Sequence, residues 1–143
     1  MIRSARRGRS IADVLATWGV SRHRGSVHNG WPSGNGSGSV TSSAAPAIEP
    51  DARAATGLDE SVLTGEGTVF GRRVAVVASE FDFLAGSIGV AAAERITAAI
   101  ERATAEALPL VASPSSGGTR MQEGTVAFLQ MVKIAAAVEL HKQ

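Results

Sequence analysis

The sequence of 143 residues contains no cysteine, no tyrosine and only 4% aromatic residues. Without cysteine the chain can form neither a disulfide nor a thiolate-bound zinc site. Its histidines, His23, His28 and His141, lack the spacing of metal ligands, so we expect no metal. No apolar run is long enough to span a bilayer, and no apolar segment follows the N-terminal arginines as in a secretory signal. These absences favour a cytoplasmic protein with no membrane partner.

Charge is unevenly distributed, although the whole chain carries only +1. Residues 1–48 hold six arginines and one acid, a net charge of +5. Residues 49–143 hold eight basic and twelve acidic residues, a net charge of −4. A basic tail on a mildly acidic body does not indicate a nucleic-acid binder, so we expect no nucleic-acid partner.

The first 50 residues have the composition of a linker, because glycine, serine and proline dominate most of them. Such a segment buries too little apolar surface to offset the entropy lost on ordering. We therefore predict a disordered basic leader over residues 1–50. Within it, Ser10 and the apolar spacing that follows predict a short helix over 10–18. The Arg-rich, Ser-rich start also fits an organellar transit peptide.

Residues 51–143 have the pattern of a layered α/β domain. A short helix closed by Gly57 precedes two strands over 61–83, which reverse at Gly71. Gly65 and Gly67 interrupt the first of these strands, and Val74, Val76 and Val77 form a buried run in the second. The periodicity then predicts a helix over 90–108, a short buried strand over 108–116 and a buried apolar helix over 121–141. Such a helix needs further partners to cover it.

Two glycine turns lie between a predicted strand and the helix that follows it: Ala85-Gly86-Ser87 and Ser116-Gly117-Gly118. The first N–H groups of a helix lack internal partners, and glycine lets a ligand approach them closely. Such a turn can stabilise an oxyanion, an enolate or a phosphate, but for a single glycine pair a purely structural turn is the more common explanation. Neither a P-loop nor a dinucleotide fingerprint is present. Arg120 either holds an anionic group or pairs with Glu123.

Three stretches resemble the carboxyltransferase β-subunit of bacterial acetyl-CoA carboxylase: TGEGTVFGRRVAVV, EFDFLAGSIG and the run from AERITAAIERA through SPSSGGTRMQEG to TVAFLQMVKIAAA. The sequence SGGTRMQE at 116–123 resembles the family's SGGARMQE, and FLAGS at 83–87 resembles its F-x-GGS. The similarity covers roughly residues 52–143 and is absent from 1–50. It implies an α/β fold, a partial crotonase-like core of ββα repeats, over residues 51–143.

The resemblance also implies a reaction and its partners. A carboxyl group would pass from carboxybiotin, on a separate biotin carboxyl carrier protein, to acetyl-CoA or another acyl-CoA, giving malonyl-CoA or an analogue for fatty-acid synthesis. A partner carboxyltransferase subunit would complete the enzyme. Gly117 and Gly118 would supply backbone N–H groups to an oxyanion hole, and Arg120 would position that turn or an anionic group. Three residues would lie near the CoA: Phe83, Gly86 and Ser87.

The chain departs from this family in three ways. It lacks the four-cysteine zinc ribbon of many β-subunits, and Ala85 replaces the first glycine of GGS. The family also continues past this point with a second glycine turn that usually completes the oxyanion hole. We therefore expect no malonyl-CoA formation by this chain alone. A non-catalytic truncated remnant, or an interaction module that binds a partner carboxyltransferase subunit, is the alternative.

Overall fold

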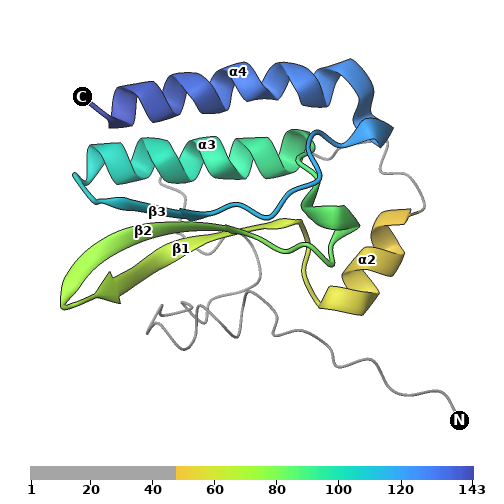
Figure 1. The fold of residues 1–143 in the computed structure, drawn as a ribbon, viewed down its shortest axis with the longest axis horizontal. Coiled ribbons are helices and arrows are strands. Elements are labelled where there is room, and N and C mark those ends of the chain that lie inside the picture. Colours follow the sequence, from red (N-terminus) through yellow and green to blue (C-terminus); the bar gives the residue numbers. More distant parts are fainter. Residues whose placement is uncertain (1–47) are drawn as a thin grey trace, which may run out of the picture.

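The computed structural model describes residues 48–143, which form a three-stranded sheet with two layers of helix on one face (Figure 1). Strand β1 (Val62–Val69) pairs antiparallel with β2 (Arg72–Ser79), and β3 (Leu110–Ser113) pairs parallel with β2 on its other side. Helix α3 (Val90–Ala105) lies on the sheet, and α4 (Gly124–His141) lies on α3. The described chain is therefore the α/β arrangement expected from the sequence.

Helix α2 (Ile48–Thr56) precedes the sheet and includes the last three residues of the predicted leader. The remainder of that leader, with the helix predicted over 10–18, lies outside the described residues. Gly57 adopts φ +71° directly after α2, and its N–H donates to the Arg53 carbonyl at 2.8 Å. The prediction that Gly57 closes this helix is confirmed, because the left-handed region is where glycine ends helices at least cost.

The hairpin β1–β2 reverses at Phe70 and Gly71, which adopt φ +49° and +77°. This pair of positive φ values gives a two-residue turn whose twist matches the strands. The predicted reversal at Gly71 is confirmed, whereas Gly65 and Gly67 do not interrupt β1, because both pair in register with β2. The central strand is buried from Val74 to Ser79, as its valines predict.

The main core lies between the sheet and α3, where the apolar faces of the two elements meet. Ile96 and Ile100 of α3 are 8% and 2% exposed, as the helical spacing predicts. The helix ends at Ala105, earlier than predicted, because Ala107 turns to φ +50° and Leu108 folds back into the core. The buried cluster comprises Val62, Val77, Ala92, Ile96, Ala99, Ile100 and Ala137.

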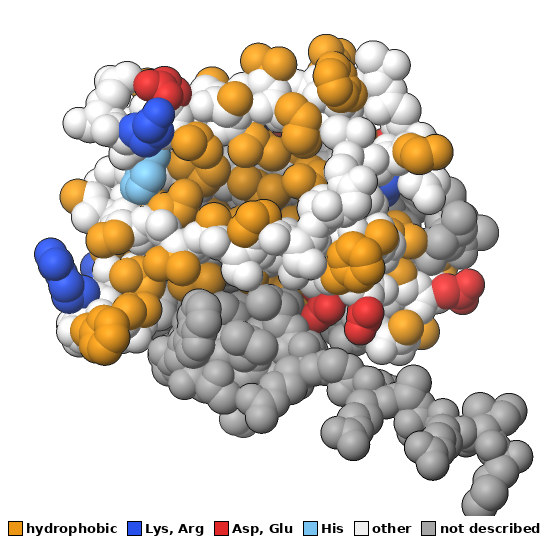
Figure 2. All heavy atoms as spheres, viewed as in Figure 1, with side chains coloured by type: hydrophobic (Ala, Val, Ile, Leu, Met, Phe, Trp, Pro, Cys, Tyr) orange, Lys and Arg blue, Asp and Glu red, His pale blue; other side chains and the backbone are white. Residues whose placement is uncertain are grey.

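Two predictions of burial are wrong. Strand β3 is only partly buried, and Ala112 is exposed, because β3 is the edge strand of the described sheet. Helix α4 buries only Ala127 and Ala137, because one of its faces packs on α3 and no other described element covers the rest. Its exposed apolar side chains are Val126, Phe128, Leu129, Val132, Val138 and Leu140. Figure 2 shows hydrophobic side chains on the surface over α4.

Helix α4 also starts later than predicted. A short 3-10 turn, η2 (Met121–Glu123), comes first, and Gly124 at φ +61° separates it from the helical run. The glycine turn at 116–118 is therefore not the N-terminus of α4, and the α4 dipole does not act directly on it. Among the described residues, no helix has the length and apolar character needed to cross a membrane.

Candidate functional site

The two glycine turns lie against each other at the end of the sheet where β2 and β3 finish and α3 begins (Figure 1). The Gly117 N–H donates to the Ala85 carbonyl at 2.8 Å, and the Ile88 N–H donates to the Gly118 carbonyl at 2.9 Å. The Arg120 N–H closes the contact by donating to the Ile88 carbonyl at 2.9 Å. Carboxyl ends of parallel strands are a common place for ligands in α/β folds.

Gly86 lets the turns approach this closely. It adopts φ +64°, and a Cβ there would overlap the carbonyl oxygen of Ser115. The 3-10 turn that contains it, η1 (Leu84–Gly86), also holds Leu84 and Ala85 at φ +49° and +55°. Ala85 thus occupies a conformation that favours glycine, which explains physically why the resembling motif has glycine at this position.

Gly117 and Gly118, the two predicted donors, differ in their surroundings. The Gly117 N–H is held by Ala85, so the structure leaves it no free direction toward a ligand. Gly118 is exposed at φ +108°, and a Cβ there would have no atom within 4 Å. Its N–H donates only to the Ser116 hydroxyl, at 3.1 Å and within the same exposed turn. The Gly117 N–H is therefore bonded to the other glycine turn, whereas the Gly118 N–H is bonded within its own turn.

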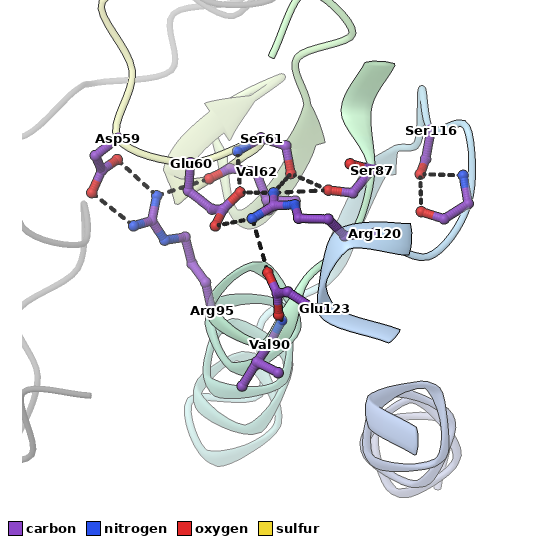
Figure 3. Close-up of polar contacts among 11 residues, drawn as sticks. Asp59, Glu60, Ser61, Val62, Ser87, Val90, Arg95, Ser116, Arg120 and Glu123 are labelled. Atoms are coloured by element: carbon purple, nitrogen blue, oxygen red, sulfur yellow. Dashed lines mark hydrogen bonds and ion pairs between the residues drawn. The ribbon is translucent and has the colours of Figure 1, made fainter. Parts of the chain in front are cut away.

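Arg120 lies beneath these turns and is 1% exposed (Figure 3). Both of its terminal nitrogens bind the Glu60 carboxylate, Nη1 at 3.1 Å, and Nη1 also binds Glu123 at 3.2 Å. Nη2 donates to the Ser87 carbonyl at 3.1 Å. The pairing with Glu123, one of the two alternatives that the spacing left open, is confirmed. A side chain this deeply buried between two carboxylates cannot reach an anionic ligand at the surface, so Arg120 acts as support for the turn.

Sequence reasoning missed Glu60 and Ser61, which lie just before β1. The Ser61 N–H donates to Glu60 Oε1 at 2.7 Å, and the Ser61 hydroxyl donates to the Ser87 carbonyl at 2.8 Å. Glu60 is separated from Arg120 by 60 positions, so no local spacing could have indicated the pair. Together they join the start of β1 to both glycine turns.

Glu123 also caps the N-terminus of α3. Its Oε2 accepts the Val90 N–H at 2.7 Å, so a residue 33 positions away caps a helix whose own N-cap, Gly89, has no side chain. A Cβ at Gly89 would overlap this carboxylate. The negative Glu123 carboxylate lies beside the N-terminus of α3, so it also interacts favourably with the α3 helix dipole.

The predicted CoA neighbours Phe83, Gly86 and Ser87 lie at this junction but are not equally accessible. Phe83 is completely buried, with its ring centroid 5.9 Å from Arg120 Cζ. Gly86 is buried as well, whereas Ser87 is partly exposed. Phe83 and Gly86 therefore support the turns from inside in this structure, and contact with CoA stays a prediction for this segment.

Asp59 and Arg95 form a second, more exposed ion pair beside Glu60. Arg95 donates to both carboxylate oxygens, at 3.1 and 2.9 Å. Burial raises the pKa of Asp59, but the hydrogen bonds and charge of Arg95 outweigh it and hold that pKa below its usual 3.8. No group of three or more histidine or acidic side chains with the geometry of a metal site occurs in the part of the chain that the structure describes.

Comparisons of the sequence and of the fold with known proteins agree on one family. The sequence profile of the carboxyl transferase domain matches residues 34–143. The expectation that the family similarity is absent from residues 1–50 is therefore wrong for residues 34–50. The chain is 88% identical over 92 residues to the probable biotin-dependent acyl-coenzyme A carboxylase beta3 subunit of Mycobacterium tuberculosis, covering 64% of this chain and 19% of that one. The chain thus spans about a fifth of the length of that relative.

Two further proteins broaden the comparison. The acetyl-coenzyme A carboxylase carboxyl transferase subunit beta of Rhizobium meliloti is 45% identical over 93 residues, which are 65% of this chain and 31% of that one. Among solved structures, transcarboxylase 12S with methylmalonyl-coenzyme A and methylmalonic acid bound matches with a TM-score of 0.53 and 31% identity, covering 54% of this chain and 15% of that chain. Both the sequence and the fold therefore point to carboxyltransferases with the crotonase-like fold.

Proposed function

Because the chain belongs to the carboxyl transferase domain family, we propose that it forms the acyl-CoA half of a carboxyltransferase site of a biotin-dependent acyl-CoA carboxylase. The observation that supports this most directly is the position of Gly118, an exposed residue whose N–H is bonded within its own turn to the Ser116 hydroxyl, on a turn held by a buried ion pair. Such a donor has the placement that an oxyanion hole requires, since it is held rigidly before the substrate arrives.

The reaction replaces a proton on the acyl α-carbon by a carboxyl group. When that α-carbon loses its proton, negative charge develops on the thioester oxygen, and the Gly118 N–H would donate a hydrogen bond to it. Carboxybiotin on its carrier protein would supply the carboxyl group and finally hold the proton on its ring nitrogen. One donor of this kind is worth about 3 kcal/mol of transition-state stabilisation.

We place the thioester oxygen at Gly118, and we assign none of the described residues to biotin. The substrate in this proposal is acetyl-CoA or another short acyl-CoA, with malonyl-CoA or its analogue as the product for fatty-acid synthesis in the cytoplasm. Transcarboxylase 12S, a structural relative, has been solved with methylmalonyl-coenzyme A. Propionyl-CoA, whose carboxylation at the α-carbon would give methylmalonyl-CoA, is therefore compared directly with acetyl-CoA in the test below.

The test is a carboxyl-transfer assay with carboxylated biotin carrier protein and either acetyl-CoA or propionyl-CoA. The full chain is assayed alone and together with a segment of the Mycobacterium tuberculosis relative that follows the matching region. We expect no product from the chain alone and carboxylated acyl-CoA from the mixture. Gly118→Val should abolish the product yet keep CoA binding measurable, because a β-branched residue cannot hold φ +108° without moving the amide. Absence of product from every mixture, while the intact relative is active, would refute the proposal.

The exposed face of α4 favours a second candidate function, an interaction module that binds a partner carboxyltransferase subunit without catalysis. Phe128 and Val132 are 65% and 69% exposed on this face, and large apolar surfaces usually mark contact sites. Stable binding of the chain to the relative's subunit, with no carboxyl transfer in any mixture, is the outcome that selects this function over the first.

A further inference from the structure

We infer that Glu60 is a positioning residue for the Gly118 amide and acts through Arg120. The inference rests on the proposed function, since it names a residue that places the proposed oxyanion donor. The contact of Glu60 on which the inference rests is its ion pair with Arg120. Its carboxylate binds both terminal nitrogens of Arg120, whose backbone belongs to the same segment as Gly118.

The ion pair is buried at both ends. The side chains of Arg120 and Glu60 are 1% and 5% exposed, whereas those of the neighbouring pair Arg95 and Asp59 are 15% and 33% exposed. Water competes little with a buried pair, and a guanidinium that binds a carboxylate through two nitrogens is fixed in orientation as well as in position. Glu60 is itself held by the Ser61 N–H at 2.7 Å.

The fixed guanidinium transmits this orientation to both turns. Its Nη2 donates to the Ser87 carbonyl of the first turn at 3.1 Å. In the second turn the Arg120 N–H and the Gly118 carbonyl both bond to Ile88, at 2.9 Å each. Figure 3 shows Arg120, Ser87 and the adjacent pair Glu60 and Ser61 converging from separate segments. A movement of the Arg120 side chain would therefore move the residues on either side of the Gly118 amide.

The position of the Arg120 side chain also depends on the negative charge of Glu60. Arg120 also binds Glu123, which caps α3 at Val90. Without the Glu60 carboxylate, Arg120 would be drawn toward Glu123 alone and away from the start of β1. The loss would release the hydrogen bonds between the turns while the sheet and α3 keep their own packing.

The first experiment measures amide hydrogen exchange in the full chain for Glu60→Gln, with Asp59→Asn as the matched control at the adjacent ion pair. We expect the amides of Ile88, Gly117 and Arg120 to exchange at least roughly tenfold faster in Glu60→Gln, a change that corresponds to ~1.4 kcal/mol of local destabilisation. The amides of β2 should change much less, and Asp59→Asn should leave the turns unaffected. Equal acceleration of β2 and the turns would overturn the inference, because Glu60 would then support only the fold.

A second variant serves if Glu60→Gln does not fold. Glu60→Gln with Arg120→Met removes both charges of the pair, which is tolerated better in a protein interior than leaving one charge alone. We expect this double variant to recover thermal stability but not the slow exchange of Ile88 and Gly117. Recovery of both together would overturn the positioning role.

The carboxyl-transfer assay then separates this inference from the proposed function. In the complemented mixture, Glu60→Gln should lower kcat more than it raises the KM for acyl-CoA, because a displaced donor affects mainly the transition state. A larger effect on KM than on kcat would contradict the inference. Failure of the proposed function would instead appear as absence of product with the unsubstituted chain, a result that leaves the exchange experiment decisive on Glu60.

Discussion

Replacing Gly86 by alanine tests whether the two glycine turns touch as the structure shows. At this position a Cβ would overlap the Ser115 carbonyl oxygen, and the backbone stands at φ +64°. The substitution therefore adds two costs, the strain of the left-handed region and the separation of two packed backbones. Gly71→Ala adds only the first, because Gly71 has a similar φ of +77° with no atom within 4 Å of its Cβ position.

The two costs can be assigned separate magnitudes. An alanine in the left-handed region costs about 1 kcal/mol relative to glycine. Forcing an extra methyl group into a filled space costs a further ~1–3 kcal/mol, because backbone atoms must shift to admit it. We therefore expect the free energy of unfolding to fall by about 1 kcal/mol in Gly71→Ala and by about 2–4 kcal/mol in Gly86→Ala. The difference between the variants measures the contact of the turns alone.

Urea unfolding of the full chain measures both values under one set of conditions. The urea dependence of the free energy should be unchanged, so that the loss appears in the midpoint. Amide exchange should also accelerate at Gly117, whose N–H donates to Ala85 across the contact, in Gly86→Ala but not in Gly71→Ala. Equal destabilisation by the two substitutions would refute the close approach of Ser115 to Gly86.

The remaining predictions concern three other parts of the chain. Ala85→Gly should raise the free energy of unfolding or leave it unchanged in the same urea experiment, because the relief of strain at φ +55° opposes the greater freedom of glycine in the unfolded chain. A decrease in the free energy of unfolding of more than about 1 kcal/mol would contradict the positive φ of Ala85. Phe128→Glu combined with Val132→Lys should reduce binding of the dye ANS and change the free energy of unfolding by less than about 0.5 kcal/mol, because both side chains are exposed and lie one helical turn apart. Unfolding of this double variant would show that this face of α4 is covered. The pKa of Asp59 is lowered on folding, so the ionised Asp59 carboxylate stabilises the fold fully above about pH 4, and this stabilisation is lost as the pH falls through the folded-state pKa. The difference in unfolding free energy between the unsubstituted chain and Asp59→Asn should therefore shrink from about pH 5 to about pH 3. A constant difference would exclude the ion pair as its cause.

The sequence by itself determined the local elements of this protein. The valines of β2 and the spacing of Ile96 and Ile100 in α3 predicted their burial, because alternation and helical periodicity are properties of neighbouring residues. Gly57 and Gly71 were predictable for a similar reason, since a positive φ at the end of a helix or in a tight hairpin selects glycine. The motif SGGTRMQE also indicated the family, which the comparisons then showed over residues 34–143.

Only the tertiary structure decided which groups at the site are buried and which are exposed. The apolar sequence of α4 predicted a core helix, but periodicity does not reveal whether another element covers a face, and most of its large side chains are exposed. Gly117 and Gly118 are neighbouring exposed glycines, yet the Gly117 N–H donates across to Ala85 whereas the Gly118 N–H donates to Ser116 within its own turn. Glu60 and Arg120 meet across 60 positions because the chain folds β1 beside the second turn, a contact that no local pattern encodes.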